Sequence, residues 1–198
     1  MSDGRRTFVA ALQVSLDGYV RGPEDEGDWV DSWADALWLL EPVDAFVLGR
    51  GMFEGRYEAY WDAALADPDT ASAMYGREPY SREVDYARLA HETPHIVLSK
   101  TMTEATWPNV RIARDVAEIA ALKDEPGDAV YVVGGPGLVA TLMNANLIDV
   151  LQLIVQPVLL GGGLALFDGL ERRQPLELVS ATPGPDGRVE LTYCVAPS

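Results

Sequence analysis

The chain has 198 residues, of which 48% are hydrophobic and 23% charged, and this composition predicts one folded domain over residues 1–198. Its 15 Lys and Arg against 31 Asp and Glu give a net charge of −16, which disfavours nucleic acids and anionic membranes as partners. The single cysteine, Cys194, excludes an internal disulfide, and no apolar run is long enough to cross a bilayer, so we expect a cytoplasmic protein.

Short apolar runs separated by turn residues or helical patterns predict the strands of one sheet. They cover residues 7–14, 45–48, 95–98, 110–112, 129–133, 150–160, 176–181 and 189–195. Because most of these runs alternate with helical segments, we expect a largely parallel sheet. The last two runs flank a Pro- and Gly-rich segment at 183–187, which predicts an antiparallel hairpin at one edge.

Apolar residues at helical spacing predict helices between several strands. The first helix would end at Pro42, the second begins with a capping box of Asp115 and Glu118, and the third follows a glycine cluster. Segment 62–94 is polar without a strong period, which indicates loops and short helices over one face of the core. The helical faces are formed by Trp33, Leu37 and Leu40, by Ile119 and Leu122, and by Leu138, Leu142 and Ala145.

A glycine cluster follows the strand predicted at 129–133 and opens a helix. Glycines let a ligand approach the backbone, and the free N–H groups of a helix N-terminus attract a phosphate. An ordinary strand-to-helix turn explains the glycines equally well, and their order is not the Rossmann fingerprint. The cluster consists of Gly134, Gly135, Pro136, Gly137 and Leu138.

Two further strands end in residues that suit phosphate binding. Ser99, Lys100 and Thr101 follow the strand at 95–98, and Lys100 is one of only two lysines. Gly49, Arg50, Gly51 and Met52 follow the strand at 45–48. Each segment by itself is typical of a turn, but ligands of open α/β sheets bind beyond the carboxyl ends of the strands. Together the three strand ends predict a phosphate site.

Other polar residues are weaker candidates. Asp17 and Gly18 follow the first strand and are typical of a turn, although a carboxylate there could orient a substrate. The acidic run at 24–31 matches no calcium-binding loop, and His91 and His95 lack further ligands at metal spacing. We therefore expect no metal site.

Five segments, in this order, resemble the dihydrofolate-reductase-like superfamily. They are SLDG at 15–18, LGRGMFE at 48–54, VLSKT at 97–101, VVGGPGL at 132–138 and LIDVLQLIVQPVLLGGGLALF at 147–167. The resemblance is greatest to the C-terminal reductase domain of bacterial bifunctional riboflavin-biosynthesis deaminase-reductases and their stand-alone relatives. It implies a three-layer α/β sandwich whose central sheet has about eight strands, mixed but mostly parallel, with helices on both faces and a C-terminal antiparallel hairpin.

The resemblance also implies a reductase that uses NADPH and is often a homodimer. Gln13 and Val14 would lie near the nicotinamide, and Trp29 would lie on the loop that closes over it. Residues 49–52 and 99–101 would hold the adenosine and its 2′-phosphate, and residues 134–138 the pyrophosphate. The cofactor-binding residues it implies are Gln13, Val14, Trp29, Gly49, Arg50, Gly51, Met52, Ser99, Lys100, Thr101, Gly134, Gly135, Pro136, Gly137 and Leu138.

The substrate side departs from the family pattern. Val133 stands where the riboflavin-pathway reductases commonly carry an acidic substrate ligand, and Met52 stands where a threonine often follows Gly-Arg-x. Trp33, Phe53, Tyr57 and Trp61 are candidates for the walls around a flat substrate, although core packing is the expected role of at least half of the aromatic residues. Asp17, Asp31 and Asp35 are the candidate proton donors, with water as the alternative.

We therefore expect hydride transfer from NADPH to a C=N or C=O bond of a small, pteridine- or pyrimidine-like substrate. By similarity the activity is that of a 5-amino-6-(5-phosphoribosylamino)uracil reductase or resembles dihydrofolate reductase. The alternative is a non-catalytic NADP-binding or assembly protein that retains the fold. A Rossmann dehydrogenase that uses NADH is a third possibility, but Arg50 and Lys100 favour the phosphorylated nucleotide.

Overall fold

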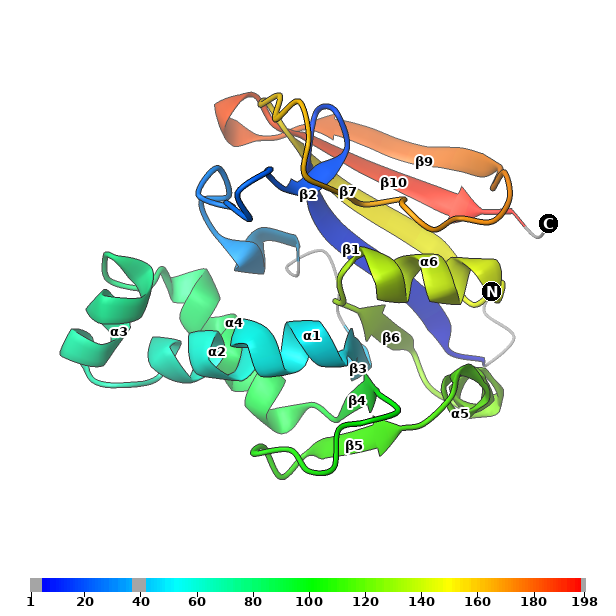
Figure 1. Cartoon of the computed structure of the whole chain (residues 1–198), viewed down its shortest axis with the longest axis horizontal. Coiled ribbons are helices and arrows are strands. Elements are labelled where there is room, and N and C mark those ends of the chain that lie inside the picture. Colours follow the sequence, from blue (N-terminus) through cyan, green and yellow to red (C-terminus); the bar gives the residue numbers. More distant parts are fainter. Residues whose placement is uncertain (1–4, 37–41, 197–198) are drawn as a thin grey trace.

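The computed structural model describes residues 5–36 and 42–196, and a twisted sheet of eight strands runs through them in the order β5-β4-β3-β6-β1-β7-β10-β9 (Figure 1). The six strands from β5 to β7 are parallel, and β10 and β9 continue the sheet as an antiparallel hairpin. This confirms the predicted mixed sheet. Its strands are β1 (Thr7–Ser15), β3 (Val43–Gly49), β4 (His95–Leu98), β5 (Val110–Ala113), β6 (Ala129–Val132), β7 (Val150–Gln156), β9 (Leu176–Pro183) and β10 (Val189–Val195).

Helices cover both faces of this sheet, which confirms the three-layer arrangement (Figure 1). One core cluster packs α5 and α6 against Phe8, Ala10 and Val14 of β1, and a second packs α2, α4 and η1 against Val9 and Ala11. The first face carries α5 (Val116–Ala120), η3 (Ala121–Asp124) and α6 (Pro136–Asn144); the second carries η1 (Trp33–Ala36), α1 (Arg50–Met52), η2 (Phe53–Tyr57), α2 (Glu58–Ala64), α3 (Pro68–Tyr75) and α4 (Ser81–Glu92).

The helical run from Arg50 to Ala64 contains a π-helical turn. Residues of α1 lead directly into η2, which is π-helical, and η2 leads directly into α2. A π turn closes its hydrogen bonds over five residues instead of four and therefore holds one extra residue. Phe53, Tyr57 and Trp61 nevertheless all face the second core cluster.

One predicted strand boundary needs correction, and two short strands were not predicted. The strand expected over 150–160 ends at Gln156, because Pro157 has no backbone N–H to continue the ladder. Strands β2 (Tyr19–Arg21) and β8 (Leu164–Ala165) were not expected; they pair with each other in a separate two-stranded sheet and are too short to show an apolar pattern.

The predicted helices appear with small differences. The helix through Trp33 is the short 3-10 helix η1, and Leu37 and Leu40 lie outside the described residues. The Asp115 side chain accepts the N–H of Glu118 at 3.1 Å and begins α5 as expected. Segment 62–94 contains the end of α2 together with α3 and α4, so it does cover one face of the core.

A further 3-10 turn, η4 (Pro185–Gly187), joins β9 to β10. Among the described helices none is both long and apolar enough to span a membrane. The described part of the chain also contains no cluster of three or more His, Cys, Asp or Glu side chains placed to hold a metal ion.

Candidate active site

The carboxyl ends of β3, β4 and β6 meet at one edge of the sheet. Gly49 pairs with Leu98 across β3 and β4, and the N–H of Val133 donates to the carbonyl of Val47 at 3.1 Å. A Cβ on Gly134 would lie 3.2 Å from the backbone nitrogen of Gly49, so a glycine is needed for this close approach. The three predicted phosphate-binding segments are therefore neighbours in space.

Backbone donors are accessible at this edge. Helix α6 begins at Pro136 with Gly135 as its N-cap, and no side chain caps the free N–H groups. A Cβ at Gly135 or at Gly137 would meet no other atom within 4 Å, so both glycines border open space. An uncapped helix N-terminus with accessible backbone suits an anion.

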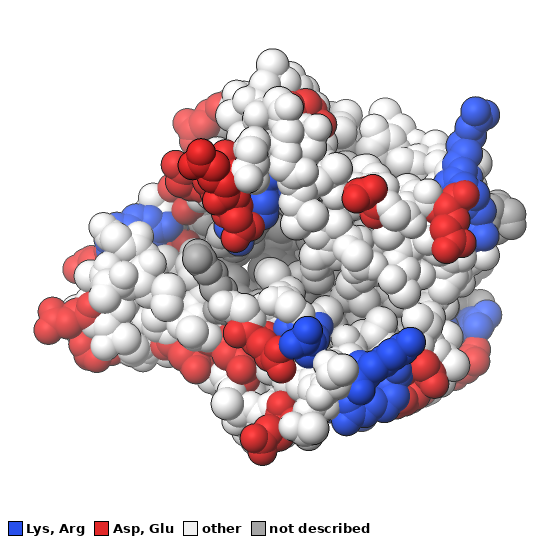
Figure 2. Space-filling model, viewed as in Figure 1, with Lys and Arg blue, Asp and Glu red and all other residues white. Residues whose placement is uncertain are grey.

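Cations lie beside these donors. Arg50 is half exposed and pairs with Glu54 at 2.9 Å, whereas Lys100 is exposed and forms no ion pair with the described residues. The Ser99 hydroxyl accepts the N–H groups of Thr101 at 3.2 Å and Met102 at 2.9 Å, which fixes the loop that carries Lys100. Figure 2 shows Lys and Arg side chains gathered beside a hollow, over α1 and β4.

Sequence reasoning missed Arg114, which belongs to the same edge. Its Nη1 donates to the carbonyl oxygens of Ser99 at 2.9 Å and Met102 at 2.6 Å, so it supports the loop between these residues. Arg114 directly follows β5, as Arg50 directly follows β3. The signal that could have found it is therefore its position after the strand predicted at 110–112.

Gln13 lies near the carboxyl end of β1, the strand between β6 and β7. It is 2% exposed, its Nε2 donates to the Ser32 carbonyl at 2.7 Å, and its Oε1 accepts from Nε2 of Gln156 at 2.8 Å. These two bonds fix the orientation of its amide. Val14, the next residue, faces the opposite side of the sheet and packs in the first core cluster.

A cavity of about 640 Å³ lies on the Gln13 side of the sheet. It is enclosed by the loop before η1, the end of β7 and the turn η4, which are far apart in the sequence. Trp29 lines it, and the indole Nε1 is buried without a hydrogen-bond partner among the described residues. The lining residues are Trp29, Asp31, Asp35, Arg82, Gln156, Pro157, Val158, Pro185, Asp186 and Arg188.

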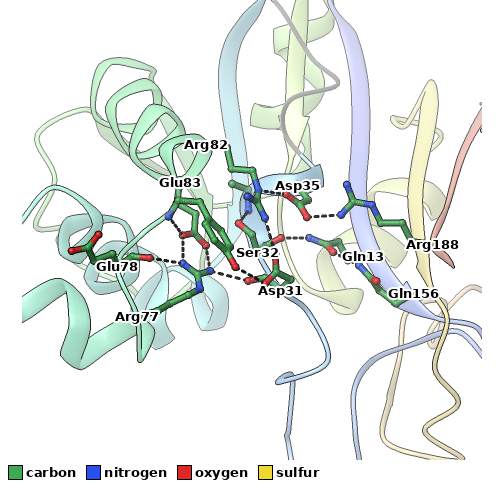
Figure 3. Close-up of polar contacts among 12 residues, drawn as sticks. Gln13, Asp31, Ser32, Asp35, Arg77, Glu78, Arg82, Glu83, Gln156 and Arg188 are labelled. Atoms are coloured by element: carbon green, nitrogen blue, oxygen red, sulfur yellow. Dashed lines mark hydrogen bonds and ion pairs between the residues drawn. The ribbon is translucent and has the colours of Figure 1, made fainter. Parts of the chain in front are cut away.

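Two arginines hold Asp35 in this cavity (Figure 3). The Asp35 carboxylate, 4% exposed, accepts from Nε of Arg82 and Nη1 of Arg188, each at 2.5 Å. Arg82 also donates to Asp31 at 2.8 Å. Burial works against the charged form of Arg82, but the hydrogen bond and charge of Asp35 and the charge of Asp31 outweigh it and raise the pKa of Arg82.

A second ion pair, between Arg77 and Glu83, lies within segment 62–94 and supports the loop that carries Asp31 (Figure 3). Glu83 is fully buried and accepts two hydrogen bonds from Arg77, at 2.8 and 2.9 Å, and one from the N–H of Tyr80 at 2.8 Å. Burial raises the pKa of Glu83, but hydrogen bonds from Arg77, Tyr80 and Ser32 lower it below its usual range. Arg77 also donates to the Asp31 carbonyl at 3.0 Å. Glu83 of α4 therefore positions, through Arg77, the loop that carries Asp31 just before η1.

Asp17 lies in the turn between β1 and β2. Its carboxylate accepts from the Ser15 hydroxyl at 2.7 Å and from the N–H groups of Gly161 at 2.8 Å and Leu160 at 3.2 Å. The hydrogen bond from Ser15 and those from the backbone lower the pKa of Asp17. The carboxylate thus joins two loops, and its predicted catalytic role stays a prediction.

Most of the predicted substrate walls lie in the core. Phe53, Tyr57 and Trp61 are each less than 5% exposed, and none of the three lines the cavity. They pack in the second core cluster, as does the buried Val133. Trp33 is half-buried, with the guanidinium of Arg21 5.3 Å from its ring centre. Trp29 is thus the predicted aromatic residue that reaches the cavity.

Comparison with known proteins connects this geometry to one family. The model of the RibD C-terminal domain matches residues 6–189. The chain is 28% identical over 194 residues to the uncharacterized protein YyaP of Bacillus subtilis, covering 96% of this chain and 95% of YyaP. A second Bacillus subtilis protein, the uncharacterized YwjB, is 25% identical over 181 residues, which are 87% of this chain and 89% of YwjB.

Solved structures share the fold. A putative riboflavin biosynthesis protein from Shewanella sp. PV-4 superposes with a TM-score of 0.68 at 24% identity, covering 97% of this chain and 100% of the other. A dihydrofolate reductase from Enterococcus faecalis, solved with NADP(H), superposes with a TM-score of 0.59 at 19% identity, covering 96% and 97%. The fold is therefore dihydrofolate-reductase-like.

Proposed function

The chain belongs to the RibD C-terminal domain family, and we propose that it is an NADPH-dependent reductase that transfers a hydride to a C=N or C=O bond of a small heterocycle. The observation that carries the proposal is the meeting of Gly49, the loop at 99–101 and Gly134 at one edge of the sheet. That edge offers backbone donors and cations in a chain whose net charge is −16.

The residues at this edge fit a nucleotide with several phosphates. Gly135 and Gly137 leave the space that a pyrophosphate needs against the backbone, and the uncapped α6 N-terminus supplies N–H donors. Lys100 and Arg50 suit the 2′-phosphate, and Arg114 holds the Lys100 loop in place. This arrangement favours NADPH over NADH.

The remaining residues orient and enclose the acceptor. NADPH, when bound, supplies the hydride. Gln13 presents a fixed amide beside the cavity, and Trp29 provides a flat wall that excludes water. A proton must also reach the product, and a donor must carry a proton at neutral pH. Asp17 has a lowered pKa, and Asp31 and Asp35 both accept hydrogen bonds from guanidinium groups, so we infer that water delivers this proton.

Titration of the protein with NADPH, followed by the nicotinamide fluorescence, tests the cofactor site. We expect saturable binding, and binding of NADH weaker by about tenfold. Turnover is then measured as NADPH oxidation with a panel of pterins, pyrimidines and small carbonyl compounds. Absence of nucleotide binding, or equal affinity for NADH and NADPH, would overturn the proposal.

A non-catalytic NADP-binding protein is the second candidate. Its support is Val133, which is buried and brings no polar group to the place where related reductases carry an acidic ligand. NADPH binding without oxidation by any member of the panel would favour this candidate.

We also propose that the protein forms a homodimer through β9, with a second copy of the chain as its partner. Every residue of this edge strand is exposed, including Leu178 at 56% and Val179 at 60%, and Glu177 is its one charged residue. Pairing with the same strand of a second copy would cover its free backbone groups. Sedimentation velocity tests this: a dimer is expected, Leu178→Glu should shift it to monomer, and a wild-type monomer would contradict it.

A further inference from the structure

The cavity beside Trp29 contains more carboxylates than cations. Its lining includes Asp31, Asp35 and Asp186 against Arg82 and Arg188. The chain as a whole also carries a net charge of −16. An anionic group that enters the cavity therefore meets an unfavourable field unless one of the two guanidinium groups is free to bind it.

Both guanidinium groups are already paired with carboxylates. Asp35 accepts from Nε of Arg82 and Nη1 of Arg188 at 2.5 Å each, and Asp31 accepts from Nη2 of Arg82 at 2.8 Å. Nη2 of Arg188 lies 3.9 Å from Glu190. A phosphate could take over the donors that bind Asp35 only by displacing it, and the donors left over belong to guanidinium groups whose charge Asp31, Asp35 and Glu190 already offset. Because Asp35 is 4% exposed, the displacement would leave a buried charge without a partner, which is strongly unfavourable.

The groups that remain available suit an uncharged ring. The Nε1 atom of Trp29 and the Nε atom of Arg188 are buried and have no partner among the described residues, so each can donate one hydrogen bond to a carbonyl oxygen. Asp31 and Asp186 are exposed and can accept from ring N–H or amino groups. The apolar part of the lining comes from Pro157, Val158 and Pro185.

We propose that the cavity takes a planar nitrogen heterocycle without a phosphate group, and that Asp35 determines this specificity by holding Arg82 and Arg188 away from phosphate. The proposal rests on the reductase function proposed above. It narrows that function, because the expected uracil substrate of the related reductases carries a phosphoribosyl group.

Removal of the Asp35 charge tests this directly. The protein is first saturated with NADP⁺, so that the proposed nucleotide site at Gly49, residues 99–101 and Gly134 is filled. Inorganic phosphate is then titrated into the protein and its binding is measured by calorimetry. We expect no saturable phosphate binding by the wild type, and in Asp35→Asn an increase in phosphate affinity of at least about tenfold, because two guanidinium groups lose their partner. Arg188→Gln added to Asp35→Asn should remove the gain.

Two results would overturn the proposal. One is saturable phosphate binding by the wild type that Arg188→Gln abolishes. The other is a folded Asp35→Asn variant, with an unchanged circular dichroism spectrum, that binds phosphate no better than the wild type.

A second measurement does not depend on the folding of Asp35→Asn. Wild-type turnover is compared for pairs of heterocycles that differ only by a phosphate ester. The free member is expected to have a kcat/KM at least about tenfold higher, and preference for the phosphorylated member would overturn the inference.

The outcomes separate this inference from the proposed function. If NADPH does not bind, the reductase proposal fails, and phosphate titration of the nucleotide-free wild type and Arg188→Gln proteins still decides the cavity question. If NADPH binds and is oxidised only by phosphorylated acceptors, the reductase proposal stands and this inference fails.

Discussion

The sheet edge where Gly49, Lys100 and Gly134 meet and the cavity beside Trp29 border the same sheet but differ in how their cations are paired. At the edge, Lys100 is exposed and forms no ion pair with the described residues, Arg50 is half exposed and pairs only with Glu54, and the backbone at Gly135 and Gly137 borders open space. In the cavity, Arg82 and Arg188 are both paired with Asp35. If both proposals hold, the burial and pairing of each cation, more than the net charge of the chain, decide where an anion can bind.

The two regions also differ in how the sequence builds them. The edge consists of short segments that each directly follow a strand. The cavity joins residues as far apart as Asp35 and Arg188, and helix α4 holds its loop in place through Glu83. If the regions are independent, changes in one should leave the other intact.

Loss of the buried Glu83 charge should have the largest effect. Breaking a buried ion pair costs about 3–5 kcal/mol because the remaining partner keeps its charge. We expect Glu83→Gln to lower the free energy of unfolding by about that amount, measured in urea, while the affinity for NADPH changes by less than about twofold.

A matched control lies on the same helix. Arg88 and Asp85 form an exposed pair at 3.5 Å, and Arg88→Gln should change the free energy of unfolding by less than about 0.5 kcal/mol. If Glu83→Gln abolishes NADPH binding in protein that remains folded, the two regions are not independent.

Acid should destabilise the fold through His95, the first residue of β4. Burial lowers the pKa of His95 from 6.5 to about 4, against the hydrogen bond to the Thr93 carbonyl, which raises it. Below pH 6.5 the His95 side chain of the unfolded chain binds a proton that the folded chain does not. The free energy of unfolding therefore decreases as the pH is lowered. The expected loss is about 2 kcal/mol by pH 5 and about 3 kcal/mol near pH 4.

Urea unfolding measured between pH 7 and pH 5 checks this and avoids most of the titration of carboxylates. His95→Gln should flatten the profile in this range. Saturating NADPH should offset this loss of stability by mass action if the edge binds the nucleotide, because the ligand binds only the folded chain. A wild-type profile that is flat between pH 7 and pH 5 would contradict the assignment.

Two glycine variants separate packing from ligand contact at the edge. A Cβ on Gly134 would lie 2.4 Å from Cδ2 of Leu138, so Gly134→Ala should cost about 1–3 kcal/mol of stability. A Cβ on Gly135 meets nothing within 4 Å, so Gly135→Ala should fold normally and bind NADPH at least about tenfold more weakly. Normal NADPH affinity in Gly135→Ala would remove residues 134–138 from the proposed pyrophosphate site.

The smallest effects are expected from the cations of the edge. Lys100→Ala should weaken NADPH binding by about 1 kcal/mol, or roughly fivefold, and leave NADH binding unchanged. Arg114→Gln should do the same through the loop that it supports.

Arg111→Gln provides the control, because Arg111 is an exposed residue of β5 that lies 3.7 Å from Glu118 of α5. Equal loss of NADPH and NADH binding in Lys100→Ala would place Lys100 away from the 2′-phosphate.

Local sequence patterns were sufficient for most of the fold and for the meeting of Gly49, Ser99 and Gly134 at one edge of the sheet. The predicted strands at 95–98 and 189–195 match β4 and β10 because proline, glycine or a polar turn bounds each apolar run. Gly49 and Gly134 could be placed together because parallel strands end at one edge of a sheet.

The cavity could not be assembled in this way. Arg82 and Arg188 lie 47 and 153 residues from Asp35, and no local pattern connects them. The spacing of Phe53, Tyr57 and Trp61 indicates one helical face, but spacing alone cannot tell a buried face from a ligand-binding one.

The π turn in the helical run from Arg50 to Ala64 gives this run one residue more than a regular α-helix of the same length along its axis needs. Deleting one residue there, such as the exposed Gly55, would let the run wind as a regular α-helix. Because the π turn absorbs this extra residue, Arg50 and Trp61 would keep nearly the same relative direction, whereas a deletion from the regular helix α2 would turn the two ends by about 100° relative to each other. A one-residue deletion should therefore be tolerated better at 53–57 than at 58–64.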